Sequence, residues 1–415
     1  MPLTAWCAKL TSCTSGDPER IVVQSQTMEH ALAASGTQAS RSSAQSSSLL
    51  DSATFRSDEH DDECDEDEDM LTSSARRLSN LIRRPRVPTI SATSLYNTLQ
   101  THGVVVIDCR DADEFALRHV HGSLNCTYVK GRKKSVDDVI EKNQNKALAC
   151  KLAMRDLMEI VVIGANRSTM LYKMDWGYRF ARMLLTEDRV HSVKFMAQGF
   201  AYFARKYDFL LQTRPSICVG LPTPAAKSKG ASESASLQYP NEIVDGFLYL
   251  GNFWQANSAK VIAALKITHV INMGATTEDR DKFDNVEYFD VEIPDKVDVD
   301  IRKEFEPTIA FIEKAMSAPQ GRVLIHCVQG VSRSSTIVIW YVMVTTKCTL
   351  SAAYAHVLKC RPLIYPNHGF MQQLMDYEKE LYGTTSVTFE DLELLQQGLL
   401  PPTDRTGSLL RESFM

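Results

Sequence analysis

The sequence predicts an α/β protein with two folded domains, and three observations support this. A length of 415 residues with 44% apolar residues is enough for two ordinary hydrophobic cores. Between about 88 and 210, helical stretches alternate with short apolar strands, the pattern of a parallel sheet. Further along, an apolar strand at 323–325 leads through a polar loop into an apolar helix at 336–344. We therefore expect an N-terminal parallel α/β domain and a C-terminal α/β domain whose central sheet is flanked by helices.

The domains are predicted to be joined and flanked by unstructured chain. Residues 1–86 are rich in Ser and then acidic, with little periodicity, so we expect disorder there. The Pro-, Ser- and Lys-rich stretch at 212–238 is predicted to be a flexible linker. The folded domains then occupy 87–211 and 239–385. Residues 386–415 are predicted to be a disordered tail that contains a short amphipathic piece.

Charge and cysteine usage indicate a soluble protein of a reducing compartment. The formal net charge is −5, yet residues 58–69 alone hold ten acidic side chains, so the rest of the chain is basic on balance. The N-terminus lacks an apolar core of signal-peptide length, and no segment reaches transmembrane length without a charge. The ten Cys form no CxxC pair, which fits a reducing compartment better than a disulfide framework. We expect a cytoplasmic or nuclear location, with no membrane or nucleic-acid partner.

The elements of the N-terminal domain follow in order from this pattern. A helix is expected from Ser91, followed by a strand at 104–108. The apolar run at 160–163 predicts a second buried strand, and a helix is expected near 170–185.

In the C-terminal domain, the segment after the strand at 323–325 is suited to hold a phosphate group. The five residues between Cys327 and Arg333 can wrap into a half-circle whose backbone N–H groups point inward, completed by a helix N-terminus. Gly330 permits a backbone turn that a side chain would resist. The inward dipoles and the Arg333 charge favour a thiolate at Cys327, which would make it a nucleophile. The predicted phosphate-binding loop consists of Val328, Gln329, Gly330, Val331, Ser332 and Arg333.

This stretch resembles the H-C-x-x-G-x-S-R-S signature of the cysteine-dependent dual-specificity protein phosphatases. The resemblance covers about 150 residues, from roughly 240 to 385. It extends to an opening strand at 243–251, a second strand at 270–272, and a closing helix that begins with Pro366 and Asn367. Gln329 stands where the family more often has Ala, which would alter the rim of the loop without removing an N–H group.

A general acid is needed to protonate the oxygen that leaves phosphorus. The segment 292–300 offers four carboxylates between a strand at 288–291 and a helix that begins near Ile301. Alignment on the family selects Asp295 as the acid. Asp298 is the second choice, and Asp300 is expected to be the N-cap of the helix.

The implied reaction is a double displacement. Cys327 attacks phosphorus, Asp295 protonates the departing oxygen, and water then hydrolyses the cysteinyl-phosphate with Asp295 as base. Arg333 can hold two phosphate oxygens with its planar guanidinium, and the reaction needs no metal and no cofactor. By the family resemblance, the Ser334 hydroxyl assists the departure of the sulfur in the second step. Three further residues are expected to support the loop: His326, Asn272 and Asn367.

The uncharged loop favours protein substrates. Related phosphatases that act on inositol lipids or RNA 5′ ends tend to carry basic residues inside the loop, whereas Val328, Gln329 and Val331 are uncharged. The longer segment with which the classical tyrosine phosphatases recognise tyrosine has no counterpart here. A shallow site for phosphoserine, phosphothreonine and phosphotyrosine is therefore expected.

The N-terminal domain resembles rhodanese domains. The resemblance rests on Ile107-Asp108-Cys109-Arg110, Glu114-Phe115, His119-Val120-His121-Gly122-Ser123 with Asn125, and Gly199-Phe200 with Phe203. Rhodaneses that transfer sulfur carry a Cys directly after the later strand, where this chain reads Gly164-Ala165-Asn166-Arg167. Sulfur transfer is therefore not expected. The expected role of this domain is instead to dock a partner protein.

A rhodanese-like domain ahead of a dual-specificity catalytic domain is the arrangement of the MAP kinase phosphatases. That resemblance implies a phosphorylated MAP kinase as substrate, gripped by a basic cluster in the first domain. The candidate cluster is Lys130, Arg132, Lys133 and Lys134, although such clusters are usually richer in Arg. A second basic segment at 76–84 is a candidate for kinase docking, nuclear import or phosphorylation at Ser79.

Two alternatives remain open at this point. One is a phosphoprotein-binding scaffold of the same architecture with weak or no catalysis, which the presence of both Cys327 and Arg333 disfavours. The other is a dual-specificity phosphatase that acts on a protein other than a MAP kinase, because only the domain order indicates that substrate.

Overall fold

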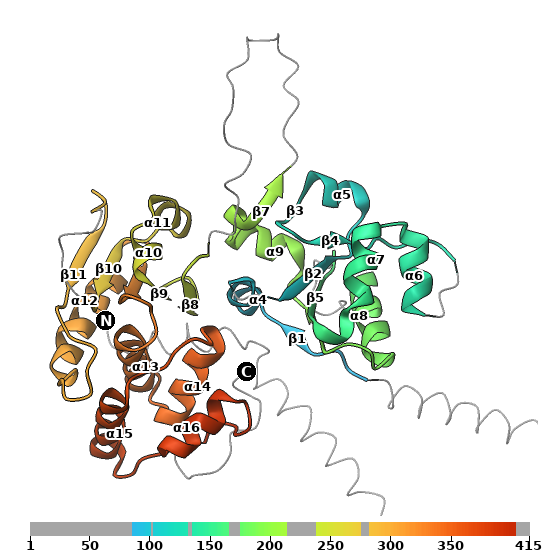
Figure 1. Cartoon of the computed structure of the whole chain (residues 1–415). Coiled ribbons are helices and arrows are strands. Elements are labelled where there is room, and N and C mark those ends of the chain that lie inside the picture. The colour runs from blue at the N-terminus through green and yellow to red at the C-terminus, as the bar shows by residue number, and fades with distance from the viewer. Residues whose placement is uncertain are drawn as a thin grey trace, which may run out of the picture. The chain divides into compact units, whose positions relative to one another are not determined.

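The computed structural model describes two α/β domains, which are shown in Figure 1 from blue to green and from yellow to red. The predicted fold class is confirmed. The described residues are 85–100, 103–131, 135–165, 175–213, 238–274 and 282–403. Several predictions concern residues outside these ranges: the N-terminal region up to residue 84, the basic residues Arg132, Lys133 and Lys134, and most of the linker.

The N-terminal domain is built from strands that alternate with helices, as its pattern predicts. Its described elements are β1 (Thr89–Ile90), α4 (Ala92–Leu99), β2 (Val104–Asp108), α5 (Ala112–Leu117), β3 (Arg118–Val120), β4 (Leu124–Asn125), α6 (Val136–Asn143), α7 (Lys146–Ala153), η2 (Arg155–Leu157), β5 (Glu159–Ile163), α8 (Trp176–Thr186), β6 (Ser192–Met196), α9 (Gly199–Lys206), η4 (Asp208–Leu210) and β7 (Leu211–Thr213). The predicted helix after Ser91 begins there because the Ser91 hydroxyl accepts a hydrogen bond from the N–H of Ser94, as an N-cap does.

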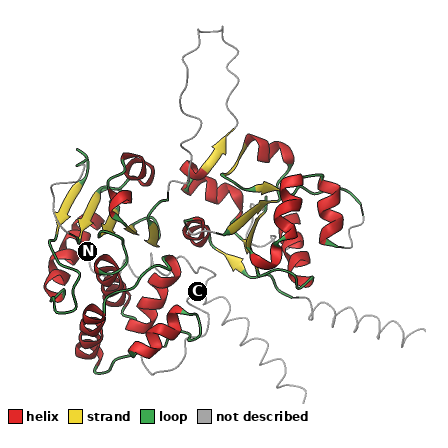
Figure 2. Ribbon diagram, viewed as in Figure 1, coloured by secondary structure: helices red, strands yellow, loops and turns green. Residues whose placement is uncertain are grey.

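The sheet of this domain has the order β1-β6-β5-β2-β4, and all its strand pairs are parallel. Because successive strand residues point to opposite faces, Val161 packs with α4 and α9, while Val162 packs with α7 and α8. Helices therefore cover both faces of the sheet (Figure 2). This explains why the strands β2 and β5 are apolar at all but one position each.

The C-terminal domain has a second sheet and most of the long helices. Its described elements are β8 (Asn241–Val244), β9 (Leu248–Gly251), α10 (Phe253–Ala256), α11 (Ala259–Leu265), β10 (His269–Asn272), β11 (Glu287–Asp290), η6 (Arg302–Glu304), α12 (Phe305–Ser317), β12 (Val323–His326), α13 (Arg333–Thr346), α14 (Leu350–Cys360), α15 (His368–Tyr382) and α16 (Phe389–Gln396). The strand order is β11-β10-β12-β9-β8, parallel except that β8 runs antiparallel to β9.

The opening of this domain differs from the predicted single strand at 243–251. The segment forms a hairpin of β8 and β9, joined by a turn in which Gly246 has a φ of +66°. Glycine adopts this left-handed conformation without the steric cost that a side chain brings. Because the residues on both sides of this turn are apolar, the sequence pattern indicated one continuous strand and gave no sign of the turn.

Helices cover both faces of the second sheet as well (Figure 2). Leu250 and Ile325 face the core formed with α12, α13, α14 and α15. On the other face, Leu324 packs with Val261 and Leu265 of α11. Helix α13 lies inside the domain, and all but two of its residues are buried, which explains why it is apolar on every side.

The prediction of a disordered tail from residue 386 was wrong for its first part. Residues 389–396 form α16, which begins with a capping box between Thr388 and Asp391. Leu392 and Leu395 are buried in the core of the C-terminal domain. Residues 404–415 lie outside the described part, and the other domain boundaries remain predictions. Among the described helices, none has the length and apolarity needed to cross a membrane.

Candidate active site

The candidate site lies at the carboxyl ends of the parallel strands of the second sheet. His326, the last residue of β12, pairs in register with Gly251 at the end of β9 and with Asn272 at the end of β10. Ligands of open parallel sheets bind at this edge, where the loops after the strands converge. The predicted phosphate-binding loop follows β12 directly and ends where α13 begins at Arg333.

Cys327 lies at the base of this loop and is almost completely buried, with 2% of its surface exposed. Its Sγ accepts hydrogen bonds from the N–H of Gly330 and from the hydroxyl of Ser334, each at 3.2 Å. The loop thus wraps around the sulfur with its N–H groups inward, as the spacing to Arg333 predicts. Burial alone raises the pKa of the Cys327 thiol, but the hydrogen bonds from Ser334, Val331 and Gly330 outweigh it and lower the pKa below its ordinary value.

Arg333 is held beside the loop by the segment that carries the predicted acid. Its Nη1 donates to the carbonyl oxygen of Ile293 at 3.0 Å, and its Nε lies 3.5 Å from Oδ2 of Asp295. On the other side, Gly274 packs against the guanidinium so closely that an added Cβ would lie 3.1 Å from Nη1. The guanidinium is therefore fixed in one orientation.

The structure brings Asp295 to the rim of the loop. Its Oδ1 accepts hydrogen bonds from the Ser332 hydroxyl and from Nδ2 of Asn367, both at 2.8 Å. Asn367 is also the N-cap of α15, and its backbone N–H donates to the Ser332 hydroxyl at 3.1 Å. The carboxyl group is thus tied both to the phosphate-binding loop and to the start of α15.

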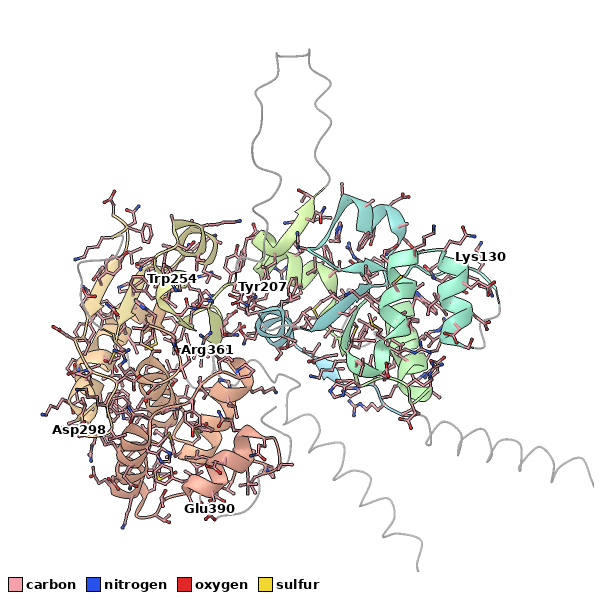
Figure 3. The ribbon with its side chains drawn as sticks, in the orientation of Figure 1. Lys130, Tyr207, Trp254, Asp298, Arg361 and Glu390 are labelled. Carbon is pink, nitrogen blue, oxygen red and sulfur yellow. The ribbon has the colours of Figure 1, made fainter. Side chains whose placement is uncertain are left out.

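Two other carboxylates of this segment, Asp298 and Asp300, lie in different surroundings. Asp298 is exposed, and within the described part of the chain it has no hydrogen bond or ion pair, which disfavours it as the acid (Figure 3). Asp300 Oδ1 accepts from the N–H of Arg302, but the N-cap of the short 3₁₀ turn η6 is Ile301 and that of α12 is Glu304. The prediction that Asp300 is the N-cap of the helix was therefore wrong. Helix α12 itself starts at Phe305, later than the predicted start near Ile301.

Two of the residues expected to support the site, Asn272 and His326, lie at the ends of the neighbouring strands β10 and β12. Asn272 Oδ1 accepts from the N–H of Gly274 at 3.1 Å, which shapes the turn that contacts Arg333. Asn272 Nδ2 also donates to Asp290 Oδ1 on the next strand at 3.3 Å. His326 is buried, with its Nδ1 at 3.2 Å from the carbonyl oxygen of Cys327.

The mouth of the site is surrounded by exposed apolar side chains. Val328 in the loop is 48% exposed, and its carbonyl oxygen accepts from the N–H of Phe253 in α10, next to the exposed Trp254 labelled in Figure 3. Across the loop, Val331 accepts from the N–H of Tyr365, whose ring is half exposed. Val297, which is also exposed, lies two residues after Asp295 in the same loop.

Sequence reasoning missed a second arginine that contacts the phosphate-binding loop. Arg361 ends α14 and is buried, and its guanidinium donates to the carbonyl oxygens of Gln329 and Gly330. A basic residue at the end of a helix usually stabilises the helix C-terminus. No motif therefore distinguishes Arg361, and only the tertiary structure places it at the site.

In the N-terminal domain, the residues of the rhodanese resemblance form a structural cluster. Arg110 pairs with the buried Asp108 at 2.7 Å and stacks on the ring of Phe200. Burial raises the pKa of the Cys109 thiol, with a further contribution from Cys126, so this thiol is kept neutral. Of the candidate docking cluster, the structure describes Lys130, which is exposed (Figure 3).

Comparison with known families matches each of the two domains to a family. The profile described as "Dual specificity phosphatase, catalytic domain" matches residues 248–380, and the one described as "Rhodanese-like domain" matches residues 91–206. The two matches include the candidate active site and the Asp108 cluster, respectively.

Two individual relatives are both named dual specificity protein phosphatases. A probable rhodanese domain-containing dual specificity protein phosphatase of Dictyostelium discoideum is 34% identical over 50% of this chain and 41% of its own length. This chain therefore spans less than half of that relative. Dual specificity protein phosphatase 1 of Homo sapiens is 31% identical over 67% of this chain and 78% of its own. The chain therefore belongs to the dual specificity protein phosphatases, with a rhodanese-like domain ahead of the catalytic domain.

Proposed function

We propose that this chain removes phosphate from phosphoserine, phosphothreonine and phosphotyrosine in a protein substrate, through a cysteinyl-phosphate on Cys327. The observation that carries the proposal is the loop around the Cys327 sulfur, with the Gly330 N–H and the Ser334 hydroxyl at 3.2 Å. A group of inward N–H donors with a low-pKa thiol at its base suits a phosphate dianion and a nucleophile at once. The proposed substrate is a phosphorylated MAP kinase.

In the first step, Cys327 Sγ attacks phosphorus, and the bond between phosphorus and the substrate oxygen breaks. Arg333 and the loop N–H groups bind the non-bridging oxygens. Asp295 delivers its proton to the departing oxygen, so that a neutral alcohol or phenol leaves. The bonds from Ser332 and Asn367 support this role, because they hold the carboxyl group at the rim, where that oxygen would lie.

In the second step, a water molecule attacks the phosphorus of the cysteinyl-phosphate. Asp295, now a carboxylate, takes a proton from this water, and the bond between phosphorus and sulfur breaks. The sulfur leaves as a thiolate, which the Ser334 hydroxyl stabilises by the hydrogen bond that it already donates. Inorganic phosphate is the product, and Cys327 is ready for another cycle.

The rim supports a protein substrate over a lipid headgroup or an RNA end. Val328, Trp254, Val297 and Tyr365 present apolar surface around the loop, which suits the side chains beside a phosphorylated residue in a peptide. Gln329 and Val331 add no charge inside the loop. A polyanionic substrate would gain little from this surface.

The MAP kinase assignment rests on the order of the two domains and on the basic cluster of the first one. In this proposal, the rhodanese-like domain binds an acidic surface of the kinase and brings its phosphorylated segment to Cys327. Lys130 is exposed and available for such a contact. Lys side chains pair less specifically with carboxylates than Arg, so binding should be sensitive to salt.

Incubation with a doubly phosphorylated MAP kinase tests the catalytic proposal. Wild type should remove phosphate from both the threonine and the tyrosine, whereas Cys327→Ser should remove neither. Asp295→Asn should be slow on this kinase but much less impaired on an aryl phosphate with a good leaving group. If wild type turns over no phosphoprotein and no aryl phosphate, the scaffold alternative replaces this proposal.

A separate experiment tests the docking cluster. The double substitution of Lys133 and Lys134 by Ala should weaken kinase capture and leave aryl phosphate hydrolysis unchanged. As a matched control, Lys146→Ala and Lys151→Ala remove two other lysines of the same domain, on α7. Equal capture by both double variants and wild type would refute the docking assignment while leaving the catalytic proposal intact.

A further inference from the structure

Arg361 is a buried cation that contacts the phosphate-binding loop from outside. It follows the last residue of α14 and is labelled in Figure 3. Only 5% of its surface is exposed. Nε donates to the carbonyl oxygen of Gly330 at 2.9 Å, and Nη2 donates to that of Gln329 at 3.1 Å. The third nitrogen, Nη1, donates to Oδ1 of Asn241 on β8 at 2.8 Å.

These contacts determine which way two peptide groups of the loop face. In a trans peptide the carbonyl and the N–H point in opposite directions. Because Arg361 holds the carbonyl oxygens of Gln329 and Gly330 outward, the N–H groups of Gly330 and Val331 must face inward. The Gly330 N–H indeed donates to Cys327 Sγ, and the N–H of Val331 also lowers the pKa of this thiol.

The loop leaves little room between its backbone and Arg361. Gly330 has a φ of +71°, and a Cβ at this position would lie 2.2 Å from the carbonyl oxygen of Gly251 and 2.8 Å from Arg361 Nη2. The glycine, the end of β9 and the guanidinium therefore form one close contact. A rotation of either peptide group would break a bond to Arg361.

The charge of Arg361 is not balanced by a carboxylate. Burial lowers the pKa of its guanidinium to about 10, and the Cys327 thiolate acts in the opposite direction. Among the described residues, no Asp or Glu forms an ion pair with it. A buried cation without a carboxylate is costly, and a nearby anion offsets that cost. The anions that this site can supply are the Cys327 thiolate and a bound phosphate.

We propose that Arg361 is a positioning residue that holds the Gln329 and Gly330 peptides in their phosphate-binding orientation and supplies a buried positive charge for the Cys327 thiolate. It does not touch the substrate, unlike Arg333, and it acts through the loop. The inference rests on the proposed reaction at Cys327. The other titratable groups around the sulfur are Arg333 on α13, Asp295 in the loop after β11 and His326 at the end of β12.

Two substitutions separate the charge of Arg361 from its geometry. Arg361→Lys keeps a positive charge but lacks the planar fork that reaches two carbonyl oxygens and Asn241 together. Arg361→Gln removes the charge and keeps a shorter polar side chain. The matched control is Arg322→Gln, because Arg322 likewise donates to a carbonyl oxygen, that of Leu265, but lies at the opposite end of β12.

The first measurement is the pH dependence of alkylation of Cys327 by iodoacetamide, followed by mass spectrometry of the peptide that contains it. It needs no turnover, so it reports on Arg361 even if the proposed function fails. In Arg361→Gln we expect the midpoint to rise by about one pH unit, a ten-fold smaller thiolate fraction at lower pH. In Arg361→Lys and Arg322→Gln the midpoint should stay near that of wild type.

The second measurement is protection against this alkylation by inorganic phosphate, which gives its dissociation constant. Both Arg361 variants should bind phosphate about ten-fold more weakly, the scale of one lost hydrogen bond to a charged group. Arg322→Gln should bind it as wild type does. Circular dichroism and thermal unfolding establish which variants are folded.

Each outcome decides for or against the proposal. If Arg361→Gln is folded and has the wild-type midpoint and phosphate affinity, Arg361 is only a structural end of α14 and the proposal is overturned. If Arg361→Gln does not fold, Arg361→Lys decides: unchanged phosphate affinity overturns the proposal, and weakened affinity at an unchanged midpoint supports it.

Discussion

The hydroxyl of Ser332 donates a hydrogen bond to Oδ1 of Asp295 at 2.8 Å, which joins the phosphate-binding loop to the loop of the proposed acid. The two residues are 37 positions apart in the chain. Since Asn367 donates to the same oxygen, the carboxyl group is held from two sides. The proposed acid is therefore hydrogen-bonded to the same loop that surrounds the sulfur of the proposed nucleophile, Cys327.

This relationship predicts that Ser332→Ala impairs protonation of the leaving group. Without the hydroxyl, Asp295 loses one of the two donors that hold it, so kcat/KM on a phosphothreonine peptide should fall about ten-fold. Aryl phosphates with good leaving groups should be affected less, because their oxygen departs without a proton. The measurement is kcat/KM across aryl phosphates of increasing leaving-group basicity, with Asp295→Asn as reference. An equal loss across the series would contradict this role.

Ser334→Ala should change the pH dependence of activity. The Ser334 hydroxyl contributes to the low pKa of Cys327, so its removal should raise that pKa, by about one unit for one hydrogen bond to a thiolate. The acidic limb of the kcat/KM profile should therefore move to higher pH. At a pH above the Cys327 pKa of both wild type and Ser334→Ala, the thiolate fraction is the same in the two proteins. The pH profile measures this shift.

The same variant should accumulate the intermediate, because the departing sulfur also loses its donor. Rapid-quench experiments should show a burst of product followed by a slow phase. Thr346→Ala is a suitable control, since that hydroxyl donates to the Val342 carbonyl at the far end of α13. A wild-type pH limb and no burst in Ser334→Ala would argue against both roles of the hydroxyl.

Gly330→Ala should abolish most phosphate binding. The new methyl group would clash with the Gly251 carbonyl oxygen at 2.2 Å, in addition to the cost of an alanine at a φ of +71°. We expect kcat/KM to fall by at least about a hundred-fold, the scale of 3 kcal/mol. Gly383→Ala is the matched control, because Gly383 also has a positive φ, +80°, but nothing lies within 4 Å of its added Cβ. Similar activity of the two variants would disprove the steric argument.

Helix α16 should contribute to the stability of the catalytic domain. Leu392 is buried in the core, so Leu392→Ala should lower the free energy of unfolding by about 2–3 kcal/mol. Leu394→Ala on the same helix removes an exposed side chain and should cost well under 1 kcal/mol. Chemical denaturation of both variants measures the difference. Equal stability would indicate that α16 detaches from the domain in solution.

Local patterns in the sequence were sufficient for the two-domain α/β fold and for the strands β2, β5, β10, β11 and β12. The strand at 104–108 and the helix after Ser91 lie where the pattern predicts, since hydrophobic periodicity and N-caps act within a few residues. The spacing of Cys327 and Arg333 likewise predicts a loop that the structure forms around the sulfur. The hairpin at Gly246 and helix α16 were missed because their surroundings resemble an apolar strand and a polar tail.

Contacts between distant segments were decided by the tertiary structure. Asp295 and Ser332 come from the loops after β11 and β12, which meet because parallel strands end at one edge of the sheet, and Asn367 joins them from the loop between α14 and α15. Arg361 reaches Gly330 only because α14 packs beside β8. No periodicity or motif encodes such a contact, since its energy depends on side chains brought together by folding. The sequence by itself determined the spacing of Cys327 and Arg333 and the loop around the proposed nucleophile, and tertiary packing decided which groups hold that loop in place.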